Sequence, residues 1–211
     1  MEILFIILLA ILSYSLGSIP SSVWVGRAYN GVDVRDYGSG NAGATNTFRV
    51  LGKEIGFVVL FLDIIKGVTA VSLVHYLGFL EQGTDRFINL QLLFGLLAVV
   101  GHILPIFEHF KGGKGIATLF GMLIGIHWVL AVACLVLFIV ILLLTKYVSL
   151  SSILATISFP MLTIFVFKRD EPLLIAFGIA ASVLVILTHT KNISRLLNGE
   201  ESKANLFKAK Q

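Results

Sequence analysis

The chain has 211 residues, of which 57% are hydrophobic and 13% are charged, with a mean hydropathy of +0.95 and a net charge of +4. A soluble domain carries about 25% charged residues, so this composition excludes an ordinary soluble globular protein. It predicts an all-α integral membrane protein. The positive charge favours anionic headgroups or anionic substrates over nucleic acid, because the basic residues separate apolar runs of membrane-spanning length. The single Cys134 lies in an apolar run and cannot form an internal disulfide.

Apolar runs of spanning length follow one another along the chain, and a spanning helix needs about 20 such residues. Clear runs cover residues 3–25, 55–77, 88–107, 148–167 and 172–189. Between them, residues 115–145 carry no charge and predict a hairpin of two shorter arms, 115–126 and 128–146, which turns near Gly125–Trp128. The prediction is one polytopic membrane domain over residues 1–211 with seven transmembrane helices.

The basic residues predict the orientation of these spans. Seven spans place the polar segment 26–53, the segment 111–115 and the basic tail from Lys191, which includes Lys208 and Lys210, on one side. Lysine and arginine are retained in cytoplasmic loops, so we expect the N-terminus outside and the C-terminus in the cytoplasm. Six spans would place the basic tail outside. The short hairpin arms also predict that the segment 111–115 dips into the membrane or lines a wet cavity, because lipid cannot satisfy exposed amides.

The first polar motif is Gly38-Ser39-Gly40-Asn41-Ala42-Gly43-Ala44-Thr45-Asn46, with Arg49 just beyond it. Glycines allow positive φ angles, and successive backbone N–H groups then converge into an anion-binding nest. Arg49 offers a bidentate fork for a phosphate. The candidate ligand-binding residues are Ser39, Gly40, Asn41, Thr45, Asn46 and Arg49. The alternative reading is a flexible solvated loop.

The second motif is Lys111-Gly112-Gly113-Lys114-Gly115, directly before an apolar helix. A glycine-rich turn ahead of a helix N-terminus is a ready phosphate site, and two ammonium groups stand beside it. The segment departs from a Walker A loop, since Glu108 and Gly115 stand where glycine and serine or threonine are required. The alternative is a basic turn that only fixes the topology.

The third motif runs from His189 to Glu201 at the end of the last span. His189 and Asn192 are separated by three residues and share one face if the helix continues. Alone, this segment also fits an interfacial helix anchored by its basic residues. Ser149 and Ser152, on the same predicted side, form a weaker polar patch.

Asp63 and Lys66 lie inside the second span, where an internal ion pair and a role facing the substrate are both open. The histidines are scattered, and neither an H-E-x-x-H motif nor a carboxylate cluster appears, so no metal is expected. The His-x4-Asp pair of many acyltransferases is absent, and so is a G-x-S-x-G elbow.

Together these segments resemble the bacterial acyl-phosphate-dependent glycerol-3-phosphate acyltransferase family, the PlsY family. The resemblance covers essentially the whole chain in order, through residues 17–20, 38–46, 49–52, 102–105, 111–115, 147–152 and 189–201. It implies transfer of a fatty acyl group from acyl phosphate to the 1-hydroxyl of glycerol 3-phosphate, which gives lysophosphatidic acid and inorganic phosphate. Neither a metal nor another cofactor is implied. The expected location is the bacterial cytoplasmic membrane, with the active site facing the cytoplasm.

By the same resemblance, the active site contains Ser39, Arg49, His189 and Asn192, and the Gly-Gly-Lys-Gly segment is the phosphate-binding loop. We expect Arg49 and one of Lys111 or Lys114 to clamp phosphates, with Ser39 and Asn192 bonding the glycerol backbone or a phosphate. His189 is either a general base or a residue that only orients substrate. The partners are then acyl phosphate, glycerol 3-phosphate and membrane lipids, and the protein is expected to act as a monomer.

Two other classes compete with this reading. A transporter for a phosphorylated solute should place its polar site near the bilayer midplane, often between repeated halves, whereas these polar groups gather at one interface and show no repeat. A sensor or scaffold that binds anionic lipids needs basic loops, but it does not need clustered glycine, serine and asparagine.

Overall fold

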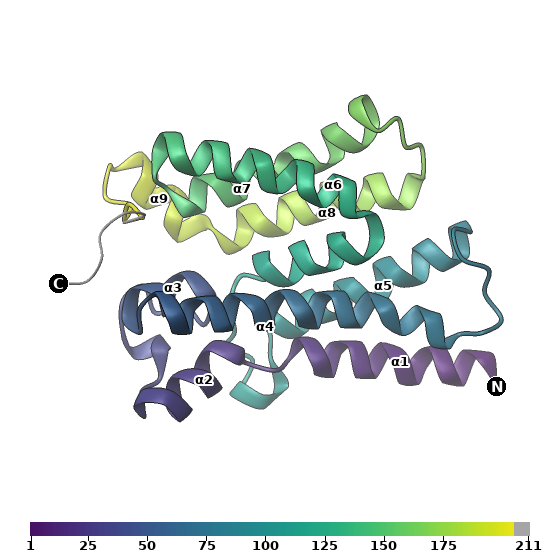
Figure 1. Ribbon diagram of the computed structural model, residues 1–211, viewed down its shortest axis with the longest axis horizontal. Helices are drawn as coiled ribbons and strands as arrows, with labels where there is room; N and C mark the ends of the chain where they lie inside the picture. The colour runs from purple at the N-terminus through teal and green to yellow at the C-terminus, as the bar shows by residue number, and fades with distance from the viewer. Residues whose placement is uncertain (205–211) are drawn as a thin grey trace. The chain divides into compact units, whose positions relative to one another are not determined.

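The computed structural model describes residues 1–204, and these residues form helices and loops without a strand, which confirms the predicted all-α class (Figure 1). The α-helices are α1 (Glu2–Gly17), α2 (Ser21–Asn30), α3 (Ala44–Val50), α4 (Lys53–Ser72), α5 (Asp85–Ile103), α6 (Ile116–Thr145), α7 (Val148–Met161), α8 (Pro172–Thr188) and α9 (Thr190–Leu197). Short 3₁₀ helices are η1 (Val34–Asp36), η2 (Leu73–Tyr76) and η3 (Ile106–Glu108), and η4 (Leu162–Val166) is a π-helix. Lys208 and Lys210 lie outside the described residues.

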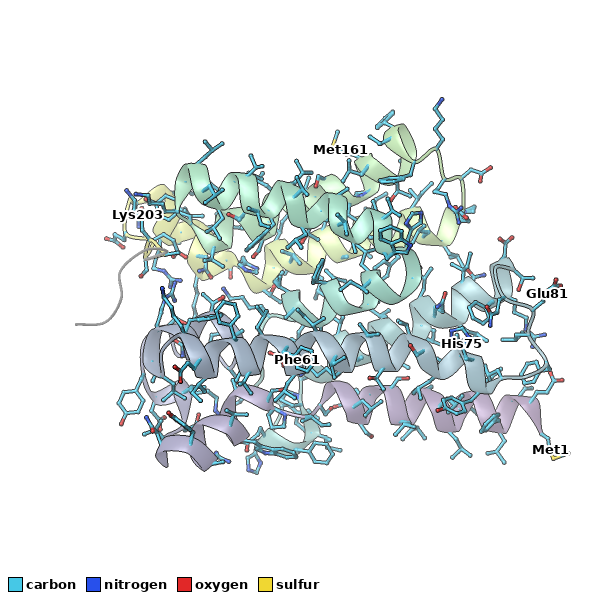
Figure 2. All side chains as sticks on the ribbon, in the orientation of Figure 1. Met1, Phe61, His75, Glu81, Met161 and Lys203 are labelled. Atoms are coloured by element: carbon cyan, nitrogen blue, oxygen red, sulfur yellow. The ribbon has the colours of Figure 1, made fainter. Side chains whose placement is uncertain are left out.

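Several helices are long and apolar enough to cross a membrane. Within residues 1–204 there are four such segments, Lys53–Tyr76, Asp85–Glu108, Ile116–Thr145 and Val148–Val166, and the number reaches six if two bent helix pairs each count as one span. Many large apolar side chains on these helices are exposed, including Phe61 at 62% and Met161 at 55% (Figure 2). Apolar exposure on this scale marks a surface that meets lipid rather than water.

The chain divides into two compact units, Met1–Trp128 and Val129–Gln211, which are described in turn. In the first unit α1, α4 and α5 run side by side (Figure 1). Glycines allow the closest approaches. A Cβ atom at Gly17 of α1 would lie 2.1 Å from the Ala98 carbonyl oxygen of α5, and one at Gly101 of α5 would lie 2.4 Å from the Tyr14 carbonyl oxygen. Small residues at such crossings are how helices in lipid gain packing contact.

The predicted span over residues 3–25 is wrong as a single helix. α1 ends at Gly17 and α2 begins at Ser21, and the two are bent by 42°. Pro20 explains the break, because proline has no N–H to donate and disfavours helical geometry in the residue before it. The break turns α2 toward the loops that carry the first two motifs.

α6 is interrupted at His127, whose φ of −150° and ψ of 83° are not helical. This residue lies inside the segment Gly125–Trp128, where the sequence predicts a turn. The arm before it belongs to the first unit and packs closely on α4, since a Cβ atom at Gly121 would lie 2.0 Å from the Ile64 carbonyl oxygen. The arm after the break opens the second unit.

In the second unit α7 and α8 pack side by side, and Ser182 Oγ of α8 donates to the Thr156 carbonyl oxygen of α7 at 3.1 Å. Pro160 lies inside α7, and the chain continues from there into η4. A proline removes one helical hydrogen bond, and a π-helical turn is a common local adjustment in membrane helices. α8 and α9 meet at His189 with a bend of 64°.

Candidate active site

Asn46 organises the loop that carries the first motif. Its side chain is 1% exposed and accepts a hydrogen bond from the Ser39 amide at 2.8 Å. Its Nδ2 donates to the carbonyl oxygens of Val34 at 2.7 Å and Tyr37 at 3.1 Å. Gly38, with φ of 62°, lies so near that a Cβ atom there would be 2.4 Å from Asn46 Oδ1. The amide of Asn46 is therefore committed to folding the loop.

Ser39 and Arg49 are both exposed and lie on either side of this organising asparagine. α3 spans Ala44–Val50, so Arg49 lies in the last turn of a short helix. Within residues 1–204, neither the Ser39 hydroxyl nor the Arg49 guanidinium has a hydrogen-bond partner in the protein. Both groups are available for a ligand, whereas Asn41 and Thr45 are half-buried.

The second motif folds back onto the end of α5. The Gly112 amide donates to the Ile103 carbonyl oxygen and the Gly113 amide to the His102 carbonyl oxygen, both at 3.1 Å. These two amides are therefore hydrogen-bonded within the protein, which leaves fewer backbone N–H donors for a phosphate than the motif suggests. The N–H groups at the start of α6 remain as the donors that a helix N-terminus offers to an anion.

The first two motifs lie against each other. A Cβ atom at Gly113 would lie 2.6 Å from the carbonyl oxygen of Ala42, so glycine is required for the two loops to approach. The Lys111 side chain is exposed and Lys114 is half-buried. Gly115 has φ of 79°, a left-handed conformation that glycine adopts without strain and that leads into α6.

A buried polar cluster lies among the helices of the first unit. Lys66 Nζ lies 2.9 Å from Asp63 Oδ1 and also donates to the Ile19 carbonyl oxygen at 2.9 Å. Ser21 Oγ donates to Asp63 Oδ1 at 2.9 Å, and His102 Nδ1 lies 3.5 Å from the same oxygen. Asp63 and Lys66 are thus an internal ion pair whose groups are held by protein partners.

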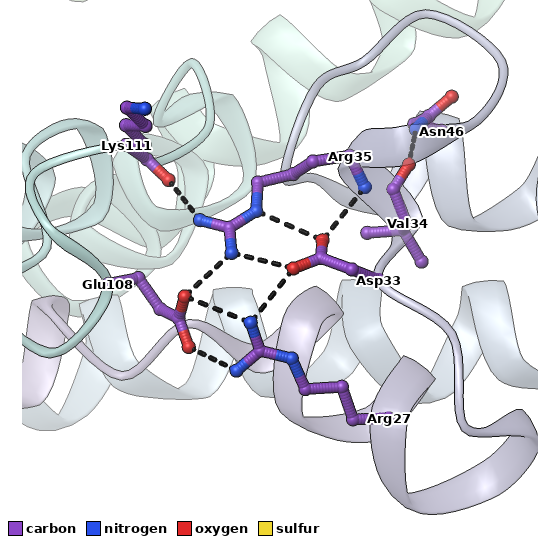
Figure 3. Close-up of polar contacts among 7 residues, drawn as sticks. All are labelled: Arg27, Asp33, Val34, Arg35, Asn46, Glu108 and Lys111. Carbon is purple, nitrogen blue, oxygen red and sulfur yellow. Dashed lines mark hydrogen bonds and ion pairs between the residues drawn. The ribbon is translucent and has the colours of Figure 1, made fainter.

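Four charged side chains connect the segment before the first motif to the segment before the second motif, as Figure 3 shows. Glu108 accepts hydrogen bonds from Arg27 and Arg35, each at 2.6 Å, and Asp33 accepts from Arg27 at 2.9 Å and from Arg35 at 2.6 Å. The hydrogen bonds from Arg35 outweigh burial and hold the pKa of Asp33 at about 2. Bonding to Asp33 likewise raises the pKa of Arg35 above its already high ordinary value.

In the second unit, Glu201 gathers the polar residues. Its Oε1 accepts hydrogen bonds from Ser149 Oγ and Asn192 Nδ2, and its Oε2 accepts from Arg195 Nε, each at 2.7 Å. Burial raises the pKa of Glu201, but these hydrogen bonds outweigh it and leave the pKa below its ordinary value. Ser152 donates to the Val148 carbonyl oxygen one turn earlier in α7.

His189 lies at the bend between α8 and α9, so the continuous helix assumed for its pairing with Asn192 is wrong. Its Nδ1 lies 2.8 Å from the Val185 carbonyl oxygen, which can only accept, so Nδ1 carries the proton. In the neutral ring Nε2 is then the acceptor nitrogen, which is the atom that a general base would use.

The sequence motifs contain most of these residues but do not reveal the ones that organise them. Ser39, Lys111 and Lys114 come from two loops in contact within the first unit, and Arg49 lies on α3 directly after the first loop. Ser149, His189 and Asn192 belong to the second unit. Glu108 and Glu201 were overlooked as organising residues. The available signal was their position, since each is an acidic residue within or beside a basic polar motif. Among residues 1–204, no group of three or more histidine, cysteine or acidic residues is arranged to hold a metal.

Comparison with known proteins assigns the family. The sequence profile described as "Glycerol-3-phosphate acyltransferase" matches residues 7–199. The glycerol-3-phosphate acyltransferase of Fusobacterium nucleatum is 42% identical over 193 residues, covering 92% of this chain and 95% of the relative. That of Enterococcus faecalis is 42% identical over 205 residues, covering 94% and 91%.

Two solved structures also match closely, and both are of PlsY, an integral membrane glycerol 3-phosphate acyltransferase. Its glycerol 3-phosphate form gives a TM-score of 0.81 at 36% identity, covering 96% of this chain and 99% of that one. Its lysophosphatidic acid form gives a TM-score of 0.80 at 37% identity, covering 94% of each chain. The chain therefore belongs to the PlsY family of integral membrane glycerol-3-phosphate acyltransferases.

Proposed function

We propose that this acyltransferase uses acyl phosphate as its donor. The 1-hydroxyl oxygen of glycerol 3-phosphate attacks the acyl carbonyl carbon, the bond from that carbon to the phosphate oxygen breaks, and the hydroxyl proton leaves to a base. The products are lysophosphatidic acid and inorganic phosphate. Acyl phosphate is a mixed anhydride and already activated, so the enzyme needs no nucleophile of its own.

The observation that carries this proposal is the contact between two glycine-rich loops with exposed cations beside them. A Cβ atom at Gly113 would lie 2.6 Å from the Ala42 carbonyl oxygen, the Lys111 side chain is exposed on the second loop, and the Arg49 guanidinium is exposed on α3, directly after the first loop. Both proposed substrates are anionic at one end, and Arg49 can hold a phosphate through two parallel hydrogen bonds. The solved relatives in glycerol 3-phosphate and lysophosphatidic acid forms support the same substrate and product for this chain.

We assign roles on this basis. Arg49 and one of Lys111 or Lys114 bind phosphate groups, and Ser39 and Asn192 bond the glycerol backbone or a phosphate. Orientation of the hydroxyl against the carbonyl, together with stabilisation of the oxyanion, supplies most of the rate, since positioning alone contributes about 7–11 kcal/mol. His189 takes the hydroxyl proton through Nε2, or it orients the substrate while a phosphate oxygen takes the proton.

We also propose a membrane topology with seven spans. Counting each bent pair as one span gives six, and counting the two arms of α6 on either side of His127 as two spans adds one, which makes seven. With seven spans the N-terminus is outside and the basic loops face the cytoplasm. We place the enzyme in the bacterial inner membrane, acting as a monomer with its active site on the cytoplasmic side.

The direct test uses the purified protein in detergent with acyl phosphate and glycerol 3-phosphate. Lysophosphatidate and inorganic phosphate should appear together in equal amounts. Acyl-coenzyme A, supplied in a parallel reaction, should not replace acyl phosphate. If the thioester supports the reaction equally well, the donor assignment is wrong.

The role of His189 needs its own pair of variants. A general base predicts that His189→Ala and His189→Gln both lose turnover by about 100-fold or more. An orienting residue predicts that His189→Gln retains much of the activity, because glutamine keeps hydrogen-bonding groups near the same place. Near-wild-type turnover in both variants would eliminate the base role.

A further inference from the structure

We propose that Glu108 and Arg35 are positioning residues, which hold Lys111 and the glycine loop in the arrangement that binds phosphate. The juxtaposition that suggests this is the Arg35 guanidinium, which bonds both the Glu108 carboxylate and the carbonyl oxygen of Lys111. The inference rests on the phosphate-binding role proposed above for this loop.

The backbone of Lys111 is held on both sides. Its amide donates to the Glu108 carbonyl oxygen at 3.1 Å. Its carbonyl oxygen accepts from Arg35 Nη1 at 3.2 Å, as Figure 3 shows. Arg35 Nη2 in turn donates to the Glu108 carboxylate at 2.6 Å. The Lys111 ammonium takes no part in these bonds, so the network fixes the place from which that side chain extends.

The segment between Glu108 and Lys111 needs such support. His109 and Phe110 have φ angles of 53° and 59°, in the left-handed region that residues with a Cβ atom rarely adopt. Two such residues in succession persist when the surrounding contacts hold them. The Phe110 amide donates to the Pro105 carbonyl oxygen at 2.9 Å, and the Glu108 side chain, 7% exposed, anchors the segment to both arginines. Left-handed backbone of this kind often accompanies a functional site.

The charges of this network cancel, since two arginines face two carboxylates. Arg27 and Arg35 therefore contribute little net positive potential for an anion, in contrast to Arg49 and Lys111. Because the network is neutral, a positioning effect and a purely electrostatic effect predict opposite changes in substrate binding when Glu108 is replaced. Removing the negative charge of Glu108 leaves an uncompensated arginine near the phosphate loop, which by charge alone should strengthen the binding of anionic substrates. Loss of positioning should weaken it.

The experiment compares the wild type with Glu108→Gln and measures kcat and KM for both anionic substrates. We expect KM for at least one of them to rise about tenfold while kcat stays within about twofold, as when an interaction common to ground and transition states is removed. An unchanged or lower KM in the folded variant overturns the inference. A merely structural role would reduce the fraction of active enzyme, and hence the apparent kcat, without moving KM.

Asp36→Asn is the matched control. Asp36 is exposed at the end of η1, beside Arg35, and the substitution removes the same charge without changing a side chain of the network. Its KM should be equal to or slightly below that of the wild type. A rise equal to that of Glu108→Gln would mean that the loss of charge alone explains the result, and the inference would fall.

Arg35→Lys keeps the positive charge but loses the planar fork, so it tests the same idea if Glu108→Gln does not fold. We expect its KM to rise in the same substrate, and an unchanged KM contradicts the inference. The wild-type reaction is measured beside both variants. If the wild type itself lacks the proposed activity, the proposed function fails, whereas an active wild type with an unaffected Glu108→Gln variant overturns only the positioning role.

Discussion

Gly113 lies against the ring of His102, because its amide donates to the His102 carbonyl oxygen at 3.1 Å and a Cβ atom there would be 2.2 Å from His102 Nε2. The other ring nitrogen of His102 lies 3.5 Å from Asp63 Oδ1. The His102 ring therefore lies between the buried ionic cluster and the glycine loop, so it connects the packed helices to the proposed phosphate site.

Gly113→Ala should be damaging for this reason. The new methyl group would also lie 2.6 Å from the Ala42 carbonyl oxygen, so the backbone of one loop has to move. We expect a loss of about 1–3 kcal/mol in the free energy of unfolding, as for overpacked interiors, together with a large loss of activity. Gly78→Ala is the control, since a Cβ atom at Gly78 would meet no atom within 4 Å. Equal melting temperatures and activities for the two variants would contradict this account.

Asn46→Asp tests the organisation of the first loop. The substitution preserves the shape but replaces Nδ2 with an oxygen that faces the carbonyl oxygens of Val34 and Tyr37. Loss of a buried hydrogen-bond donor costs about 1–3 kcal/mol in the free energy of unfolding, so the melting temperature should fall well below that of the wild type. Asn30→Asp, at an exposed site at the end of α2, makes the same change of charge and should melt close to the wild type.

Lys66→Met should destabilise the protein strongly, because it leaves the Asp63 carboxylate buried without its cation. Breaking a buried pair from one side typically costs about 3–5 kcal/mol. The double variant Asp63→Asn/Lys66→Met removes both charges and should recover a measurable part of that loss in a denaturation experiment. If the double variant is as unstable as the sum of the two single variants, the pair is not coupled as its 2.9 Å separation indicates.

The Asp33 carboxylate predicts a specific dependence of stability on pH. Its pKa is about 2 in the folded protein, below the ordinary value of 3.8, so the unfolded chain binds more protons between these values. The stabilisation is fully present above about pH 4 and declines as the pH falls toward about 2. The difference in melting temperature between the wild type and Asp33→Asn should therefore shrink across that window. Parallel curves down to the lowest accessible pH would disprove the assignment.

Arg49→Lys keeps the charge but removes the bidentate fork. Hydrogen bonds to charged groups contribute about 1.5–3 kcal/mol, so kcat/KM should fall by about 10-fold to 100-fold without loss of stability. Arg86→Lys is a suitable control, since Arg86 is exposed and approaches Glu2 only to 3.8 Å. Retention of full kcat/KM in Arg49→Lys would show that the guanidinium fork is not needed.

Hydropathy predicted the long helices well because their burial in lipid depends on average composition. The predicted spans 55–77 and 88–107 correspond closely to α4 with η2 and to α5. Hydropathy averages over about 20 residues, and so it passed over Pro20, which ends α1 early. The predicted end of the last span at residue 189 agrees with the end of α8 at Thr188, but hydropathy does not indicate the direction in which the polar segment beyond it continues.

The candidate ligand-binding residues were accessible from the sequence because glycine, asparagine and arginine cluster locally within each motif. The residues that organise them could not be recognised from the sequence. Glu108 bonds Arg35 across 73 positions of the chain, and Glu201 gathers Ser149 across 52. Such pairings depend on which helix ends lie beside each other, and a single sequence does not contain that information directly. Asn46 illustrates the converse, since its type suggested a ligand contact while its hydrogen bonds hold the loop.

The early break of α6 at His127 has a consequence for the lipid around the enzyme. The arm from Ile116 to Ile126 extends about 16 Å at 1.5 Å per residue, roughly half the thickness of a hydrocarbon core. A membrane element this short is accommodated by local thinning of the bilayer or by tilting of its neighbours. We expect the turnover rate in reconstituted vesicles to depend on the acyl length of the host phospholipids and to be highest in the thinner membranes. The thickness of the surrounding membrane would then influence the catalytic rate through this short arm of α6.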